Sequence, residues 1–333
     1  MMEDMSQTPP PHPSTLRVVV SVVVGLVAAL AAMGIFAAAY VGAFHDPRPH
    51  HVRLGVLDAR TAAAVNASGG AFSARLEPSV AALRSDLKAR RIAAGLAGRT
   101  LYLASGESYT ASAAVSTLLA ASVPGLRVVD VAPLQRGDPR GTTLFYLVIA
   151  CVFGGYLAAT LVSLLLGYGR HTRARAAALV GALAGFACLG GLLGAAIVDG
   201  YGAIEGHFLA VWAIGALVVF AAAAATAALQ TAFGLVGTGI AMVVFIILGN
   251  SSAGGPYPLT FAPGFWRAIG PYLPQAAGVG ALRGAVYFDG ENIAGRLIVL
   301  SVYAVVGAAV CIAIGRRHGP RADELELAAA GAL

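Results

Sequence analysis

The side chains that commonly perform catalysis or bind metals are few and scattered in this sequence. His45, His50 and His51 lie close together, but their proline-rich stretch has no cysteine or acidic residue at metal-ligand spacing. None of the three cysteines belongs to a C-x-x-C pair, and each lies inside a long apolar run, so a disulfide framework is not expected. We interpret the histidines as part of a solvated linker.

Motifs for nucleotide hydrolysis and covalent catalysis are also missing from the sequence. The G-x-x-x-x-G-K-[ST] loop, which cradles phosphate in Walker-type ATPases, does not occur, and the only lysine is Lys88. There is no G-x-S-x-G nucleophile elbow and no H-E-x-x-H zinc motif. We therefore expect no intrinsic enzyme activity, no catalytic residue, no cofactor and no metal.

Ionisable residues avoid the centres of the long apolar runs. Proton- and ion-coupled transporters usually carry such residues at mid-membrane, where they are costly to bury. Their absence argues against a self-contained proton antiporter, so active transport needs energy from another protein. Asp199, Glu205 and His207 lie between two of the runs, where they either line an outer vestibule or belong to a solvated loop that interrupts two helices.

The elements that position these residues are mostly apolar. Hydrophobic residues make up 58% of the chain and charged residues 11%, against about 25% charged residues in soluble domains. About 20 apolar residues span a bilayer core, so the run at 208–248 is long enough for two crossings, which we divide near Gln230 and Thr231. The composition predicts a mainly α membrane protein with six transmembrane helices, at 17–44, 141–169, 176–198, 208–248 (two helices) and 297–315. Residues 1–16 and 316–333 are expected to form cytoplasmic tails, the first of them disordered.

Residues 45–140 differ from the rest, with twelve Arg or Lys and seven Asp or Glu. Alternating or β-branched patterns predict strands at 52–58, 101–105 and 126–132. Between them, apolar residues at 76, 80, 83 and 87 share one helical face with Pro78 in the first turn, and residues 108–122 form a second helix. The order β-α-β-α-β predicts a small extracytoplasmic α/β domain between the first and second transmembrane helices.

The placement of arginine predicts the orientation of the chain in the plasma membrane. Short loops near membrane-spanning helices carry this signal, and the cytoplasmic ones hold more Arg and Lys. If the N-terminus is cytoplasmic, seven arginines lie in the inside segments and three in the short outside segments. This distribution favours cytoplasmic N- and C-termini, and it places residues 45–140 and 250–292 outside the cell.

The outer segment 250–292 is rich in proline, glycine and aromatic residues. Pro263 and Pro274 are each expected to begin a short helix, and Trp266 has an amphipathic ring suited to a membrane interface. Two interpretations stay open. The segment is either a re-entrant outer gate, with Asn250, Pro263, Trp266, Pro274 and Arg283 as its candidate residues, or a surface loop with interfacial anchors.

Small residues at helical spacing predict close packing of the third helix. Gly181 with Gly185, and Gly190 with Gly194, are two small-xxx-small pairs. Such pairs let helix backbones approach one another, within one chain or in a dimer.

Two stretches of the sequence resemble ABC-2 type permeases, closest to the YhgE/Pip (phage-infection-protein) branch. One is VVDVAPLQRGDPRGTTLFYLVIACVFGGYLAA, which enters the second helix, and the other runs from LGNSSAGGPYP to PGFWRAIGPYLPQAAGVGALRGAVYF before the last helix. The family typically has a G-N-x-S-x-G-G segment followed by a Pro-bracketed aromatic stretch. The matching positions are Gly249, Asn250, Ser252, Gly254, Gly255, Pro263, Phe265, Pro274 and Arg283. The order of one helix, a large external domain and five further helices is similar as well.

The resemblance implies the membrane-spanning permease subunit of an exporter, working as a homodimer with a separate cytoplasmic ATPase. Subunits of this kind dock their ATPase through short cytoplasmic loops, and the candidate coupling residues are Arg170, His171, Arg173 and Arg175. The alternative is a non-transporting cell-envelope protein: a scaffold, a secretion accessory or a surface receptor whose external domain binds a partner. A nucleic-acid partner is not expected.

Overall fold

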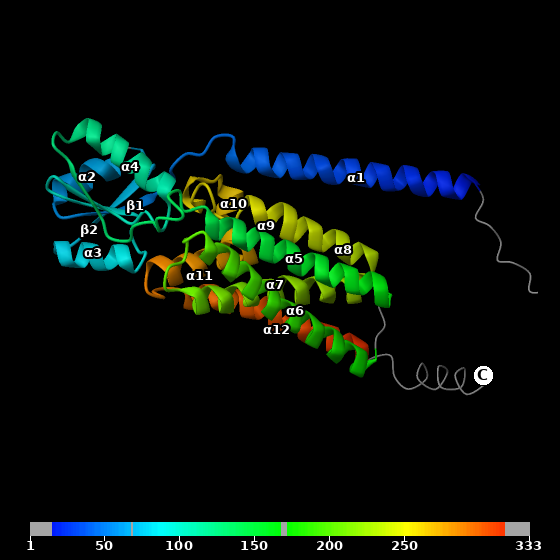
Figure 1. Ribbon diagram of the computed structural model, residues 1–333. Helices are drawn as coiled ribbons and strands as arrows, with labels where there is room; N and C mark the ends of the chain where they lie inside the picture. Colours follow the sequence, from blue (N-terminus) through cyan, green and yellow to red (C-terminus); the bar gives the residue numbers. More distant parts are fainter. Residues whose placement is uncertain (1–14, 68, 168–171, 317–333) are drawn as a thin grey trace, which may run out of the picture.

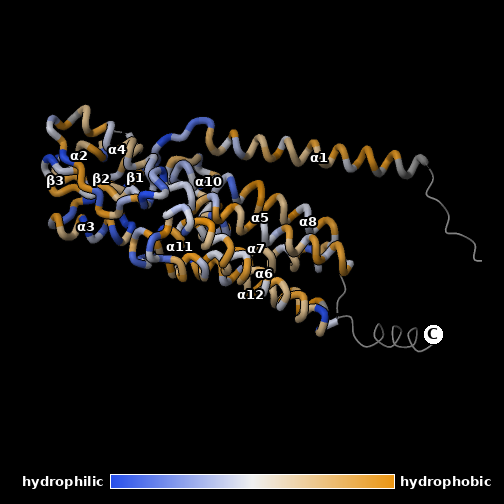
Figure 2. The backbone as a smooth tube through the Cα atoms, viewed as in Figure 1, coloured by the Kyte–Doolittle hydropathy of each residue, from blue (hydrophilic) through white to orange (hydrophobic). Residues whose placement is uncertain are grey.

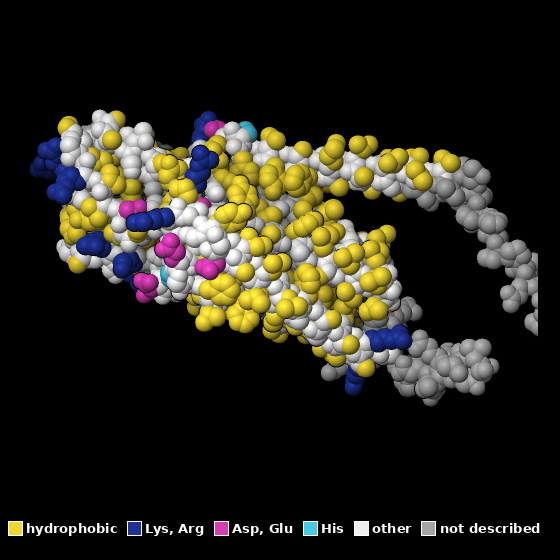
Figure 3. Space-filling view, in the orientation of Figure 1, with side chains coloured by type: hydrophobic (Ala, Val, Ile, Leu, Met, Phe, Trp, Pro, Cys, Tyr) yellow, Lys and Arg dark blue, Asp and Glu magenta, His cyan; other side chains and the backbone are white. Residues whose placement is uncertain are grey.

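The computed structural model describes residues 15–67, 69–167 and 172–316, which form a helical bundle with a small sheet at one end (Figure 1). Five helices are long and apolar enough to cross a membrane, which indicates a multi-pass membrane protein. They are α1 (Thr15–Phe44), α5 (Thr143–Leu166), α6 (Arg173–Gly200), α7 (Phe208–Phe233) and α12 (Ala294–Arg316). Apolar residues continue over the outer surface of these helices (Figure 2, Figure 3).

Helix α7 lies at the centre of the bundle and packs along α5, α6 and α12. Glycines permit the close approach, because a Cβ atom on Gly155 of α5 or on Gly191 of α6 would collide with the α7 backbone. The predicted pair Gly181 and Gly185 makes no such contact, since an added Cβ there meets no atom within 4 Å among the described residues. The close contact of α6 with α7 is made at Gly191, six residues after Gly185, and Gly194 of the second predicted pair lies close to Leu147 of α5.

Helix α1 stands beside the bundle and packs on it near its C-terminal end (Figure 1). Ala39 and Ala43 contact Ile247 and Trp266, and most other described side chains of α1 are exposed. The helix begins at Thr15, so its first turn takes up the end of the tail predicted at residues 1–16. The rest of that tail, and residues 317–333 of the other, lie outside the described residues.

The predicted fourth and fifth crossings separate at Gly234, a few residues after the expected position. Gly234 has a φ of 60°, a conformation that favours glycine. The chain then continues through α8 (Leu235–Ala241), a π-helix (Met242–Leu248) and α9 (Gly249–Ser251). Together these three segments form one apolar helix, Leu235–Ser251, which is shorter than the five long helices. The described chain thus has five long spans and one shorter helix where six equivalent spans were predicted.

The sheet domain contains the predicted β-α-β-α-β elements and three additional ones. Its five strands have the order β2-β1-β3-β4-β5, with β3 and β4 antiparallel and the other neighbours parallel. Helix α2 and strands β2 and β3 are additional to the expected elements. The elements are β1 (Val52–Val56), α2 (Ala59–Ala67), β2 (Phe72–Leu76), α3 (Val80–Lys88), β3 (Ala94–Ala97), β4 (Thr100–Leu103), α4 (Tyr109–Ser122) and β5 (Arg127–Asp130).

The first predicted helix of this domain starts later than expected. Leu76 ends β2, and α3 begins after Ser79, whose hydroxyl oxygen accepts a hydrogen bond from the amide of Ala82. This is the side-chain cap that serine commonly provides at a helix N-terminus. Pro78 therefore precedes the cap and does not lie in the first turn.

Segment 250–292 folds into short helices and one longer one. They are the 3₁₀ turns Leu259–Phe261 and Gly270–Tyr272, with α10 (Gly264–Ile269) and α11 (Pro274–Tyr287). Pro263 is the N-cap of α10 and Pro274 is the first residue of α11, so both predicted helix starts are confirmed. Helix α11 is almost entirely buried against α5, α7 and α12. It lies at the same end of the bundle as the sheet domain, opposite the first turn of α1 (Figure 1).

Candidate functional site

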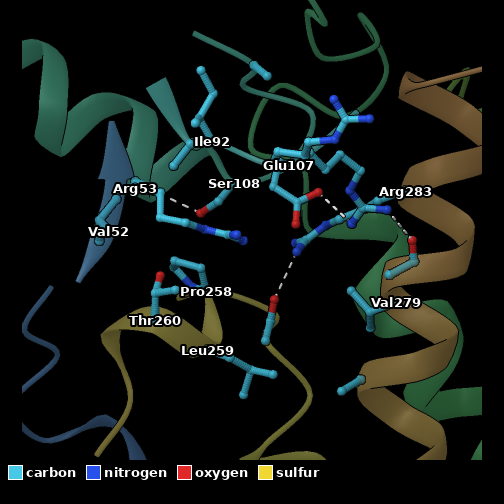
Figure 4. Close-up of a pocket in the computed structure, with 18 of the residues that line it drawn as sticks. Val52, Arg53, Ile92, Glu107, Ser108, Pro258, Leu259, Thr260, Val279 and Arg283 are labelled. Atoms are coloured by element: carbon cyan, nitrogen blue, oxygen red, sulfur yellow. Dashed lines mark hydrogen bonds and ion pairs between the residues drawn. The ribbon is translucent and has the colours of Figure 1, made fainter. Parts of the chain in front are cut away.

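A cavity of about 310 Å³ lies where the sheet domain meets the bundle. Its walls come from β1, the turn after α3, the start of α4, the segment before α10, and α11. Arg53, Glu107 and Arg283 approach the hollow from three of these elements (Figure 4). Residues far apart in the sequence therefore share one small volume.

Hydrogen bonds hold the walls of this cavity together. The hydroxyl of Thr110 on α4 donates to the carbonyl of Pro256 at 2.6 Å. The amide of His50 donates to the carbonyl of Thr260 at 2.9 Å. The sheet domain is therefore bonded to the segment before α10 at two points.

Arg283 is the central residue of the bundle-side wall. Its side chain is 5% exposed, and its guanidinium donates to the backbone carbonyls of Gly254 at 2.9 Å, Gly255 at 3.1 Å and Gly141 at 3.3 Å. Gly254 has a φ of 70°, a conformation that residues other than glycine rarely adopt. This turn thus directs two successive carbonyls at Arg283.

Arg90 joins the sheet domain to α11. Its side chain is 2% exposed and forms an ion pair with Glu107, with 2.6 Å between Nη2 and Oε2. Nη1 donates to the carbonyl of Gly280 at 2.8 Å, and the guanidinium lies 5.2 Å from the ring centre of Phe288. Arg90 has a φ of 58°, which is uncommon for a residue other than glycine.

Arg296 completes a cluster of guanidinium groups in the cavity. Its guanidinium lies directly against Gly280, where any side chain would overlap it. Arg90, Arg283 and Arg296 are near enough to influence one another electrostatically. The Glu107 carboxylate partly offsets Arg283 and Arg296, and Asp138 also acts on Arg283. Arginine keeps its charge in proteins, so this buried cluster is cationic.

The charge of this cluster suits an anion. Guanidinium groups repel cations and match the oxygens of carboxylates and phosphates. Within the described ranges, no group of three His, Cys, Asp or Glu side chains is placed to hold a metal ion. The cavity therefore offers charge and hydrogen-bond donors to an oxyanion.

The predicted gate residues take two different places. Arg283 lines the cavity, and Pro274 starts the helix that carries it. Trp266 is buried and packs against α1 and the π-helix. Pro263 caps α10, and Asn250 is a buried residue of α9 that lies beside Tyr40 of α1. That these residues act as a gate stays a prediction.

The predicted vestibule residues lie away from the cavity. Asp199 is exposed in the last turn of α6, and Glu205 is exposed in the turn between α6 and α7. A ring nitrogen of His207 is 2.8 Å from the backbone oxygen of Glu205. None of the three lines the cavity. That these residues line an outer vestibule stays a prediction.

The predicted coupling loop is described only in part. Arg173 and Arg175 are exposed in the first turn of α6, after Thr172, whose hydroxyl oxygen accepts from the amide of Arg175 at 3.4 Å. Arg170 and His171 lie outside the described residues.

Sequence reasoning missed Arg53, Arg90, Glu107 and Arg296 as members of one site. The available signal was the excess of basic over acidic residues in 45–140, which does not say where the charges meet. Comparison of the chain with protein-family models, curated proteins and solved structures gives no match.

Proposed function

We propose that the protein is the membrane-spanning permease subunit of an ABC-2-like exporter that works as a homodimer with a separate cytoplasmic ATPase. One observation carries the proposal: irregular backbone and polar side chains enter one end of an apolar bundle. Ser251, Ser252 and Gln275 are at most 2% exposed, and Arg283 is 5% exposed. Non-helical backbone at membrane depth is tolerated where it lines a cavity or is buried in protein, and broken helices build transporter sites.

The π-helix before this segment supports the same function. The buried amide of Gln275 donates to the carbonyl of Phe245 within the π-helix, so α11 is tied to it by a side chain. Single π turns inside α-helices occur frequently at functional sites. A protein that only anchors an external domain has no need for this construction.

The residues that carry the resemblance to ABC-2 permeases also act together in the fold. Gly254 and Gly255 provide carbonyls to Arg283. Gly249 packs directly against Gln275, the residue after Pro274. This clustering favours a common structural role over a chance match of separate residues.

In the proposed topology, the sheet domain and segment 250–292 lie outside the cell, and the coupling loop lies in the cytoplasm. The helix at 235–251 supplies the sixth crossing. At 1.5 Å per residue it spans about 25 Å, slightly less than the roughly 30 Å hydrocarbon core. Local thinning of the bilayer accommodates such a mismatch at modest cost.

The decisive experiment is affinity purification of the tagged chain from its host membranes in mild detergent, followed by mass spectrometry. We expect a Walker-type ATPase to copurify. Reversing the charges at Arg173 and Arg175 to Glu should abolish its recovery, whereas the matched change Arg267→Glu, on the other side of the membrane, should not. Recovery of envelope proteins with no ATPase would contradict the proposal and favour the scaffold or receptor alternative.

A further inference from the structure

The cavity between the sheet domain and α11 has more positive than negative charge. Five arginines line it, and Glu107 is its one acidic lining residue. Arg90 is paired with Glu107, and Arg91 is paired with Asp86 at 2.6 Å. The other three arginines of the lining have no acidic partner within ion-pair distance among the described residues: Arg53, Arg283 and Arg296.

Burial makes this excess costly. Removing an ion from water costs several kcal/mol unless an opposite charge or good hydrogen bonds compensate. Arg283 is compensated by three neutral carbonyls, and Arg296 is more than half buried against Gly280. The cluster therefore lacks a negative charge that a bound anion supplies.

The cavity also presents hydrogen-bond donors that the protein leaves unused. Nε of Arg90 is fully buried and has no acceptor among the described residues. Arg53, by contrast, is exposed, and its guanidinium extends into the hollow (Figure 4). Together they provide donors on a deep wall and at the opening, as a polyoxygen anion requires.

From this arrangement we propose that the cavity binds the phosphate group of a phosphate-bearing ligand, held by Arg53, Arg90 and Arg296. A phosphate monoester carries about −1.5 to −2 charge and three acceptor oxygens, which match the surplus of guanidinium groups better than one carboxylate does. The lining also contains Val52, Leu259 and Val279, which contact an organic portion next to the phosphate.

The same chemistry is offered by a lipid headgroup and by a soluble phosphate ester. The cavity volume of about 310 Å³ is at the lower end of the range for small-molecule sites, and suits a headgroup-sized molecule from either source. The inference concerns binding alone. It therefore holds or fails independently of any ATPase partner.

The test uses the full-length purified chain in nonionic detergent. Binding is measured by isothermal titration and by the rise in unfolding temperature that any ligand of the native state produces. Soluble probes are sn-glycerol 3-phosphate, with glycerol and succinate as uncharged and dicarboxylate controls. Lipid probes are mixed micelles containing phosphatidic acid or, as the control, diacylglycerol.

We expect one phosphate-bearing probe to bind, with an affinity that falls as salt concentration rises. Arg53→Gln should weaken binding about tenfold, the effect of losing one charge-assisted hydrogen bond, and Arg296→Gln should do the same. Arg267→Gln, in α10 and outside the cavity lining, is the matched control and should bind as the wild type does. Because Arg53 is exposed, its variant is expected to fold.

The probe that binds identifies the source: glycerol phosphate for a soluble ester and phosphatidic acid for a lipid. Equal binding of succinate would overturn the assignment to phosphate. Absence of binding by every phosphate probe would overturn the proposal, as would unchanged affinity in both Arg53→Gln and Arg296→Gln. The ATPase copurification reports on the proposed function separately.

Discussion

Gly154 and Gly155 are neighbours on α5 with opposite surroundings, and they offer a controlled test of the bundle. A Cβ atom on Gly155 would lie 3.0 Å from the amide nitrogen of Ala223, 3.1 Å from Cβ of Ala222, and closer still to the carbonyl of Val219. A Cβ atom on Gly154 meets nothing within 4 Å in the described part of the chain. The change from Gly to Ala therefore adds the same methyl group at both positions, but among the described residues only the one at position 155 meets other atoms.

The magnitude follows from this comparison. Replacing Gly by Ala inside a helix is worth about 1 kcal/mol of helix propensity, and both variants receive it. The Gly155→Ala methyl group meets backbone atoms of α7, which cannot rotate away, so the two helices must separate. Overpacking of this kind costs about 1–3 kcal/mol. Gly155→Ala should thus be less stable than Gly154→Ala by about 1–3 kcal/mol, since the propensity term cancels.

Thermal unfolding in detergent measures this difference. The buried thiols of Cys151 and Cys311 become reactive when the bundle opens, and a Cys188→Ser background removes the exposed cysteine. A thiol-reactive fluorescent dye then reports the midpoint for each variant. Equal midpoints for the two alanine variants would refute the close approach of α5 and α7, and with it the central position of α7.

Three further predictions test other parts of the structure. Gln230→Met removes hydrogen bonds with three hydroxyls on α5 and α8, at 2.7–3.0 Å. At about 0.6 kcal/mol for each bond in a membrane, the free energy of unfolding should fall by about 2 kcal/mol. An unchanged midpoint of thermal unfolding would count against these hydrogen bonds. A cysteine at Ser85 should react with an impermeant thiol reagent in intact cells while one at Thr172 should not, and the reverse pattern would invert the proposed topology. Burial, aided by the Asp86 carboxylate, raises the pKa of Glu77 above 4.5. Protonation of Glu77 should therefore stabilise the fold at low pH, and this stabilisation should be lost as pH rises through the pKa of the folded state. Glu77→Gln should lack this slope in the free energy of unfolding against pH, and a slope that persists in the variant would point to another group.

Much of the fold is predictable from the sequence because its strongest signal is local. A run of about 20 uncharged apolar residues needs only a bilayer to become a helix, so the five long spans follow directly from their composition. The short helix 235–251 is harder, because Gly234 and the π turn depend on what packs against them. The sheet order was also beyond reach, because it depends on contacts between segments far apart in the sequence. Strand β3 (AGLA) in addition consists mainly of Ala and Gly, which have little intrinsic preference for strands.

The arginine cluster could not be predicted for a different reason. Arg53, Arg90, Arg283 and Arg296 come from four elements, and their meeting depends on how the sheet domain sits on the bundle. Trp266 shows the same limit, because an aromatic residue near a membrane suits both an interface and a buried contact. Only the packing of α1 against it decides which.

Helix α11 shows how one charge is kept inside an apolar bundle. Small residues dominate its sequence, so it can be buried on all sides, and the arginine it carries is met by carbonyls that the turn at Gly254 and Gly255 directs inward. Arg283 and the turn at Gly254 and Gly255 depend on each other. Without the turn, Arg283 would be a buried charge without acceptors, and without Arg283 the buried carbonyls of the turn would have no donor. The G-N-x-S-x-G-G segment and the arginine 28 residues after Gly255 therefore form one structural unit, which places Arg283 in the wall of the cavity.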